Sequence, residues 1–526
     1  MKKLISKANN GQTVGGAAIL MSVAFALSRL IGLYRDRLLA SHFGVGPVVD
    51  AYTAAFRLPD LLFSLLVSGA FAVAFIPVFS EYLSQEKRDE AWDIASSLFN
   101  ILVLATVVGA GLIIVFADPL TYLVAPGFDA DRHSMAVDLT RIMAITPVFF
   151  AISSIFGSVA QSFNRFRIFS FASVFYNLGI IFGIVVLASH SGIYGVAYGV
   201  VIGTIVQALV QILGLAGLGV KYRPHLSFRL VGVRKVLKLM LPRVLDQGID
   251  QINYTVETII GSALAAGSLT AYYYANNLKN VPLVLFSTAI STAAFPQMAR
   301  SANSGTKDEL INSFVRTARL ILFLAIPSAV FAIVARGYIV RLLFGFGDAA
   351  TANTLGWFAG TIIFTSLFQL VTRVYYAMQD TKTPFVVSIV SIALNIVFSL
   401  IFAQRYGVIG LAMAASLVAA AETIALLAIL KRRQGGFGEK RLIAGALPMT
   451  VAAGAMAAVS YFLIKRVMPL YSTDKGFPTV GPKFAVILVG AVITYLAICL
   501  LLRVSEVRQL SRRLYDMAGR PFNALT

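Results

Sequence analysis

Several charged side chains lie inside stretches of sequence that are apolar and long enough to cross a lipid bilayer. A charge near the bilayer centre costs roughly 2.5 to 3.5 kcal/mol on insertion scales, so such residues commonly line a binding site or a path for a polar molecule. The residues concerned are Arg29, Arg57, Asp60, Asp246, Asp250, Lys279 and Glu422. They are the first candidates for chemistry in this chain.

Arg29 and Arg57 lie on consecutive apolar stretches and carry forked N–H donors suited to bidentate binding of a phosphate group. Lys279, in the second half of the chain, offers a point charge to the same kind of anion. The structural alternative is that the two arginines reach for the interface or pair with Asp60 or Asp36. Three more charged residues, Arg35, Asp36 and Asp50, are candidates for a gate or for pairing within a lobe.

A stripe of charge follows one face of the segment near residues 237–264. Arg243, Asp246, Asp250 and Glu257 are spaced by three, four and seven residues, which places them on one side of a helix. Oxygen ligands for a hard cation are then available from Asp246, Asp250, Asn395 and Ser399. Two alternatives stay open, an internal salt bridge of Arg243 with these carboxylates and proton coupling through a buried carboxylate.

The composition excludes an ordinary soluble domain. The 526 residues are 58% hydrophobic and 13% charged, and their mean hydropathy is +0.81. No segment alternates as in an outer-membrane barrel, so we expect an all-α polytopic membrane protein. One cysteine, Cys499, excludes disulfides, and the four histidines show no metal-ligand spacing. No phosphate-binding loop occurs, so ATP is not the expected energy source.

Apolar segments recur about fourteen times along the chain. The expected spans are 15–34, 50–83, 92–118, 135–161, 168–188, 193–218, 237–264, 269–298, 312–336, 353–378, 384–404, 407–431, 441–465 and 483–503. The net charge of +20 comes from Lys and Arg in alternate short loops, a pattern of membrane orientation rather than of nucleic-acid binding. The positive-inside rule therefore predicts that both termini are cytoplasmic.

Two halves of the chain repeat weakly. The sequence Gly192-Ile-Tyr-Gly195 corresponds to Gly407-Val-Ile-Gly410, and Asn177 corresponds to Asn395. The halves start on the same side, so we expect two parallel six-helix lobes around a central cavity, alternating in access. The expected parts are an N-terminal lobe 1–220, a basic cytoplasmic connector 221–236, a C-terminal lobe 237–432, two additional helices in 433–503 and a basic cytoplasmic tail 504–526.

Six motifs carry a resemblance to a known family. They are Ser28-Arg29-Leu-Ile-Gly32-Leu-Tyr-Arg35-Asp36, Asp50-Ala51-Tyr52 to Arg57-Leu58-Pro59, Gly69-Ala70-Phe71 to Phe75-Ile76-Pro77, Ala125-Pro126-Gly127-Phe128, Asn164-Arg165-Phe166 and Gln379-Asp380-Thr381-Lys382-Thr383-Pro384. With them the chain resembles the MurJ/MviN-type lipid II flippases of the multidrug/oligosaccharidyl-lipid/polysaccharide exporter superfamily. The likeness covers essentially the whole chain.

The resemblance implies translocation of an undecaprenyl-diphosphate-linked peptidoglycan precursor, lipid II, from the inner to the outer leaflet of the bacterial plasma (inner) membrane. It implies a cationic cavity, a lipid-tail groove formed partly by the two additional helices and a sodium site in the C-terminal lobe. Ser64 and Asp60 replace a family arginine and asparagine, and Asn277 and Asn280 replace a family arginine and glutamate. The candidate substrate site is Arg29, Arg57, Lys279, Asp60, Asn277 and Asn280.

Alternative functions remain open at this point. They are flipping of another lipid-linked oligosaccharide, cation-coupled export of amphipathic drugs, a membrane enzyme acting on polyprenyl carriers and a non-transporting scaffold. The two additional spans argue against the drug exporter. The enzyme is disfavoured because the sequence has no cluster of His, Asp or Glu in catalytic spacing at the membrane surface. We expect no enzyme activity, no cofactor beyond a coupling Na⁺ or H⁺, a monomer, and the lipid-linked diphosphate, membrane lipids and possible cell-wall synthesis proteins as partners.

Overall fold

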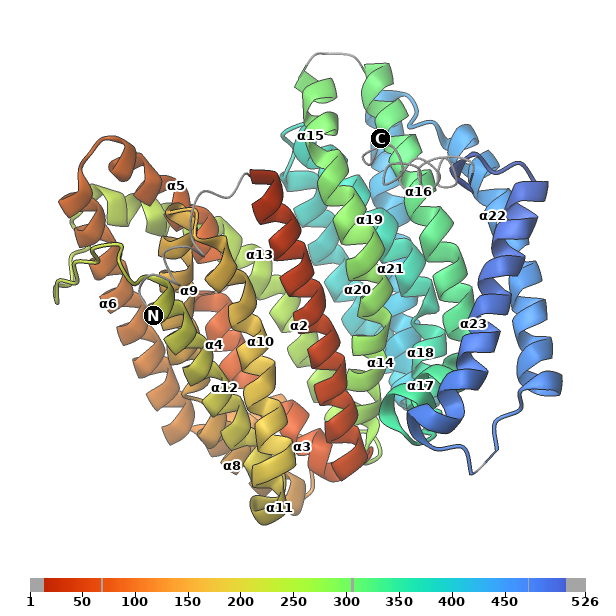
Figure 1. Cartoon of the computed structure of the whole chain (residues 1–526), viewed down its shortest axis with the longest axis horizontal. Coiled ribbons are helices and arrows are strands. Elements are labelled where there is room, and N and C mark those ends of the chain that lie inside the picture. The colour runs from red at the N-terminus through yellow and green to blue at the C-terminus, as the bar shows by residue number, and fades with distance from the viewer. Residues whose placement is uncertain (1–13, 68–69, 304–306, 472, 508–526) are drawn as a thin grey trace, which may run out of the picture. The chain divides into compact units, whose positions relative to one another are not determined.

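The computed structural model describes residues 14–67, 70–303, 307–471 and 473–507. All regular secondary structure in these ranges is helical (Figure 1). The chain divides into two compact units, Met1–Thr270 and Ala271–Thr526. Each unit is described by itself below.

The first unit is built from twelve α-helices and one π-helical turn within the described residues. They are α2 (Val14–Phe43), α3 (Pro47–Ala55), α4 (Arg57–Leu66), α5 (Ala70–Ser84), α6 (Arg88–Val115), α7 (Ala117–Val124), α8 (Ala130–Met143), α9 (Thr146–Ser162), α10 (Phe166–Phe182), η1 (Gly183–Leu187), α11 (Ala188–Ser191), α12 (Ile193–Gly214) and α13 (Val231–Ser262).

The second unit contains the remaining described helices, beginning with α14, whose first residues precede the boundary. They are α14 (Ser268–Pro282), η2 (Leu283–Thr288), α15 (Ala289–Asn303), α16 (Lys307–Val334), α17 (Arg336–Phe344), α18 (Ala349–Trp357), α19 (Ala359–Ala377), α20 (Lys382–Tyr406), α21 (Val408–Gln434), α22 (Glu439–Phe462), η3 (Leu463–Val467) and α23 (Gly476–Leu501).

Twelve helical segments of the described chain are long and apolar enough to cross a membrane. They correspond to all the predicted spans except the first and the seventh. At those two positions the structure has α2, of 30 residues, and α13, of 32 residues, which are also long enough to span. The prediction of a polytopic all-α membrane protein with about fourteen spans is therefore confirmed in type and closely in number.

The core of the first unit is a stack of aromatic rings. Phe71, Phe75 and Phe79 stack along α5 with centroids 5.0 Å apart, and the Phe79 ring meets Trp92 of α6 edge-on at 5.6 Å. Val233, Val236 and Met240 of α13 are buried in the same cluster. These apolar side chains explain why α13 groups with the first unit, whereas the sequence repeat assigns this segment to the second lobe.

The two helices outside the predicted repeat, α22 and α23, belong to the core of the second unit. Met449 and Met456 of α22 and Cys499 of α23 are buried in a cluster with residues of α16 and α19. The Tyr495 hydroxyl donates to the carbonyl oxygen of Phe323 at 2.9 Å. The additional helices are thus integral parts of this unit.

The two repeated glycine motifs share one backbone geometry. Gly192 has φ 55° and ψ −136° before α12, and Gly407 has φ 59° and ψ −140° before α21. This left-handed conformation favours glycine. At the following motif position, a Cβ on Gly195 would lie 2.5 Å from the Leu187 backbone, and one on Gly410 would lie 2.3 Å from that of Phe402. Both motifs therefore form the same tight helix-to-helix turn.

Candidate functional site

Arg57 lies within the second predicted span. The helical hydrogen bonding of this span is irregular at Phe56, whose backbone stays right-handed helical with φ −70° and ψ −23°, and Arg57 is the first residue of α4. Pro59 has no N–H to donate to the carbonyl one turn earlier, which explains the irregularity. Arg57 therefore lies beside a local irregularity within the span, with Asp60 one turn further along.

The Arg57 side chain is held by α13. Its Nε donates to Thr258 Oγ1 at 2.7 Å, and the guanidinium carbon lies 5.9 Å from the centre of the Tyr254 ring. Thr258 is buried, and its own hydroxyl donates to the Tyr254 carbonyl at 2.9 Å. Thr258 accepts a hydrogen bond from Nε alone. This contact therefore orients the guanidinium group of Arg57 without using its two terminal nitrogens.

Asp50, a candidate gate residue, is the N-terminal cap of α14. It is 1% exposed, and its carboxylate accepts from Gly267 N at 2.6 Å, Thr270 N at 2.8 Å and Thr270 Oγ1 at 2.7 Å. Backbone N–H groups at a helix start lack intrahelical partners and favour a negative charge. Asp50 therefore joins α3 to the start of α14.

Arg29, Arg35 and Asp36 lie on α2. Arg35 forms an ion pair with Asp36, with Arg35 NH2 2.7 Å from Asp36 Oδ1, and its NH1 donates to Asn177 Oδ1 at 3.2 Å. Asn177, on α10, also donates to the Ser28 hydroxyl at 3.2 Å. This network ties α2 to α10 within one unit and leaves Arg29, half-buried, one residue beyond Ser28.

Lys279 lies on α14 over an aromatic face. Its Nζ is 4.0 Å from the centre of the Phe358 ring, which is within the range of a cation–π interaction. The Tyr272 ring lies 5.3 Å from Phe358. Asn277 and Asn280 are half-buried on the same helix. Lys279, Asn277 and Asn280 belong to the second unit, whereas Arg29, Arg57 and Asp60 belong to the first.

Arg373, on α19, was not among the predicted site residues. Its Nη2 donates to Thr292 Oγ1 at 2.9 Å, and the guanidinium carbon lies 6.0 Å from the Phe295 ring centre. Gln369, one turn earlier, accepts from Ser287 and Thr288 of η2, both at 3.1 Å. An arginine in an apolar span was the available signal. The π-helical turn, a feature frequent at functional sites, follows Pro282 directly.

The predicted cation ligands fall in both units. Asn395 and Ser399 of α20 are buried together, and the Ser399 hydroxyl donates to Asn395 Oδ1 at 2.8 Å. Asp246 and Asp250 are on α13 of the first unit, and their side chains lie outside the described part of the structure. Further along α13, Asn253 donates to the buried Glu257 at 3.0 Å. Among described residues no group of three or more His, Cys, Asp and Glu could hold a metal ion.

The motif beginning at Gln379 forms a charged turn between α19 and α20. The Asp380 carboxylate accepts from the Thr383 N–H at 3.0 Å and the Thr383 hydroxyl at 2.6 Å, and it pairs with Arg433. Burial would raise the pKa of Asp380, but the bonds from Thr383 and Arg433 outweigh it and lower the pKa to about 2. The turn therefore holds a permanent charge at neutral pH.

The fold and these intramembrane charges define a multi-pass α-helical membrane protein of the transporter type. A structure titled "Inward-facing conformation of a multidrug resistance MATE family transporter of the MOP superfamily" matches with a TM-score of 0.67 and 12% identity, covering 80% of this chain and 99% of that one. At this identity the likeness shows the fold alone. A structure titled "Lipid II flippase MurJ, inward closed conformation" matches with a TM-score of 0.77 and 26% identity, covering 92% and 99%.

The family model described as "Lipid II flippase MurJ" matches residues 39–480. A relative from Bdellovibrio bacteriovorus, named "Probable lipid II flippase MurJ", is 28% identical and covers 94% of this chain and 96% of its own. The "Lipid II flippase MurJ" of Burkholderia cenocepacia is 28% identical, with coverage of 79% and 84%. The chain belongs to the lipid II flippase MurJ family.

Proposed function

We propose that this chain flips lipid II, the undecaprenyl-diphosphate-linked peptidoglycan precursor, from the inner to the outer leaflet by alternating access. The family match over residues 39–480 carries this proposal. The diphosphate and its sugar–peptide headgroup cannot enter hydrocarbon unaided, because an unpaired charge loses its hydration there. A transporter must therefore supply cationic groups that replace this water.

In this proposal Arg57 and Arg29 bind the diphosphate from the first unit. Arg57 is oriented by Thr258 and Tyr254 and interacts electrostatically with Asp60, and its terminal nitrogens carry enough N–H donors for bidentate binding. Arg29 follows Ser28, which is bonded to Asn177, so its backbone is fixed by the α2–α10 network. These fixed donors reduce the ordering cost of binding.

Lys279 contributes the cation of the second unit. The Phe358 ring beneath Lys279 holds the ammonium group in a cation–π contact. The proposal also includes Asp60 beside the cations of the first unit, and Asn277 and Asn280 on the same helix as Lys279 in the second.

The driving force in this proposal is a cation that enters down the membrane potential, which gives about 2.3 kcal/mol per charge per 100 mV. In the second unit Asn395 and Ser399 are candidate neutral oxygen donors for Na⁺, and in the first unit Asp246 and Asp250 are candidate carboxylates for binding a cation or a proton. We place the protein in the bacterial inner membrane as a monomer, with both termini in the cytoplasm. It has no catalytic role and works alongside cell-wall synthesis proteins.

Complementation tests the proposal. The chain is expressed in a bacterium depleted of its own lipid II flippase, and growth and cell shape are followed. We expect the wild-type chain to rescue growth and Arg57→Ala to fail at equal membrane abundance. Arg441→Ala, at an exposed arginine near the start of α22, is the matched control and should rescue. Absence of rescue by well-expressed wild-type chain would contradict the proposal.

A further inference from the structure

One face of α6 carries a row of polar side chains in a helix that otherwise suits a membrane. Asp89, Asp93, Ser96, Ser97 and Asn100 are spaced by four, three, one and three residues, which places them along one side. From Ile101 to Phe116 the same helix is apolar apart from Thr106. A polar row at the edge of the bilayer needs partners.

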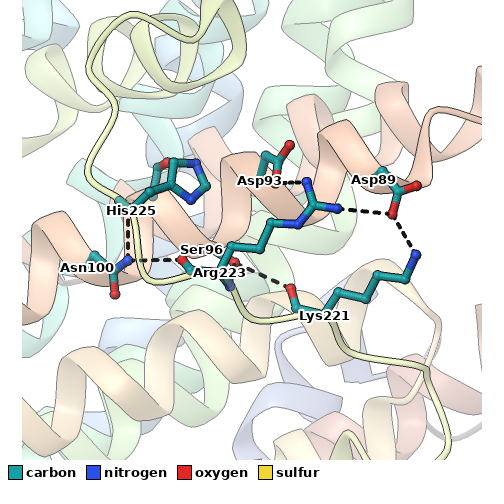
Figure 2. A network of polar contacts seen from close by, with 8 residues as sticks. Asp89, Asp93, Ser96, Asn100, Lys221, Arg223 and His225 are labelled. Atoms are coloured by element: carbon teal, nitrogen blue, oxygen red, sulfur yellow. Dashed lines mark hydrogen bonds and ion pairs between the residues drawn. The ribbon is translucent and has the colours of Figure 1, made fainter.

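The connector before α13 supplies these partners (Figure 2). Lys221 Nζ lies 2.7 Å from Asp89 Oδ1, and Arg223 NH1 lies 2.6 Å from Asp93 Oδ1. Asn100 Nδ2 donates to the His225 carbonyl at 2.9 Å. We name residues 220–229 the α6 strap.

Further contacts bind the α6 strap through its backbone as well as its charges. The Arg223 N–H donates to Ser96 Oγ at 3.1 Å, and His225 Nε2 lies 3.1 Å from Ser97 Oγ. The Tyr222 hydroxyl donates to Asn100 Oδ1 at 2.8 Å. The strap therefore lies along α6 for about three turns rather than forming a free loop.

The α6 strap turns at Pro224, where the His225 N–H donates to the Arg223 carbonyl at 2.8 Å. Up to this turn the strap faces α6: Lys221 and Arg223 pair with its carboxylates, and the Tyr222 ring meets Phe99 edge-on at 5.7 Å. Beyond the turn the apolar side chains of Leu226 and Phe228 are 53% and 58% exposed. The strap is thus held to α6 by residues 221–225 and leaves an exposed apolar segment after them.

The charge of this region is one-sided. Residues 215–241 include Lys221, Arg223, Arg229, Arg234, Lys235 and Lys238 and no Asp or Glu. Arg229, next to Phe228, is exposed and has no partner among the described residues. Aromatic rings and free cations together are typical of segments at the headgroup level of a bilayer. Pro224, which lacks an N–H, also leaves one fewer backbone donor to hydrate.

We propose that the α6 strap is an interfacial membrane anchor, whose exposed apolar segment enters the headgroup region and whose Arg229 binds the phosphate of anionic phospholipids. The polar row of α6 ends at Asn100, where the apolar run begins, so the strap lies at the boundary of the hydrocarbon. This inference concerns a surface of the first unit and does not depend on the transported substrate.

A site-specific label tests the anchor. Phe228→Cys in a Cys499→Ala background is labelled with an environment-sensitive fluorophore, and the protein is reconstituted with shallow doxyl-labelled lipids. Leu226→Cys provides a second site in the same exposed apolar segment in case the first variant does not fold. Gln85→Cys, exposed in the loop between α5 and α6, is the water-facing control. We expect the lipid quencher to remove most of the fluorescence at 228 and 226, and aqueous iodide to act mainly at 85.

The lipid charge is tested in the same samples. Brominated phosphatidylglycerol should quench the label at 228 more than brominated phosphatidylcholine, and Arg229→Gln should reduce this preference by up to about fivefold, the contribution of one basic residue near an anionic surface. Iodide quenching at 228 and 226 equal to that at 85 would overturn the anchor. Equal quenching by the two brominated lipids would overturn the role of Arg229.

Discussion

The side chains of Arg57 and Thr258 are joined by a hydrogen bond of 2.7 Å that links α4 to α13. The two residues are 201 positions apart in the sequence. Because the bond uses only Nε, the threonine orients a charged group without satisfying it. A guanidinium group that is held through Nε can use its terminal nitrogens to bind an anion reversibly inside a membrane protein.

Removing this acceptor should weaken transport without abolishing it. A hydrogen bond to a charged group is worth about 1.5 to 3 kcal/mol, so we expect Thr258→Val to lower the flipping rate by roughly tenfold or more. Thr255→Val, whose hydroxyl donates only to the Gln251 carbonyl on its own helix, should leave the rate near wild type. Equal rates for the two variants would show that Thr258 does not orient Arg57.

The sequence located Arg57 but not its partner. Apolar patterning predicts a span around residues 50–83 and identifies a charge inside it, since both depend on residue type alone. The bond to Thr258 depends on how α4 packs against α13, which a local pattern does not encode. Pro59 was the available signal for the irregularity at Phe56.

Asp50 should matter for stability more than for substrate binding. Its carboxylate accepts three hydrogen bonds at the start of α14, and loss of a helix cap typically costs about 0.5 to 2 kcal/mol. We expect Asp50→Ala to lower the melting temperature of the detergent-solubilised protein, with Asp50→Asn intermediate because it keeps one acceptor. Wild-type melting in Asp50→Ala would contradict this role.

Lys279 should depend on its charge and on the ring beneath it. We expect Lys279→Gln to reduce binding of a diphosphate lipid strongly and Phe358→Leu to reduce it more modestly, since a cation–π contact contributes about 0.5 to 2 kcal/mol. Lys465→Gln, in η3, is the control and should bind normally. Native mass spectrometry measures the affinity of each variant for the lipid, and we expect it to fall from wild type through Phe358→Leu to Lys279→Gln. Tight binding by Lys279→Gln would exclude Lys279 from the site.

The Asp380 turn predicts a defined acid sensitivity. The folded pKa is about 2 against an ordinary 3.8, so its stabilising effect is present above the ordinary value and is lost as the pH falls towards 2. We expect Asp380→Asn to lower thermal stability at pH 6 and to flatten the loss of stability between these two values. An unchanged acid profile in Asp380→Asn would show that another carboxylate is responsible.

Ion coupling is tested by the stabilising effect of Na⁺ on the purified protein. Ligand binding to the folded state raises stability with concentration, so a sodium-dependent rise in melting temperature is expected for wild type. Asp250→Asn and Asn395→Ala should each weaken this rise, while K⁺ at equal ionic strength should not produce it. A rise that depends on pH but not on Na⁺ would favour proton coupling.

The α6 strap illustrates the limit of sequence inference in the same way. Its basic residues predict a loop between two spans, and the structure has this loop between α12 and α13. The polar row of α6 that receives it becomes visible only when Asp89, Asp93 and Asn100 are seen against Lys221, Arg223 and His225 (Figure 2). Pairs that are distant in sequence cannot be assigned from charge patterns alone.

The most direct measurement of the central claim is the accessibility of lipid II at the outer leaflet of cells depleted of their own flippase. A probe that reaches only the outer leaflet is applied to cells expressing wild-type chain, Arg57→Ala or Arg29→Ala at equal levels. The account predicts that wild-type chain restores accessible lipid II and that both variants leave it inside. Full accessibility in the Arg57→Ala and Arg29→Ala cells would contradict the assignment of these arginines to the substrate.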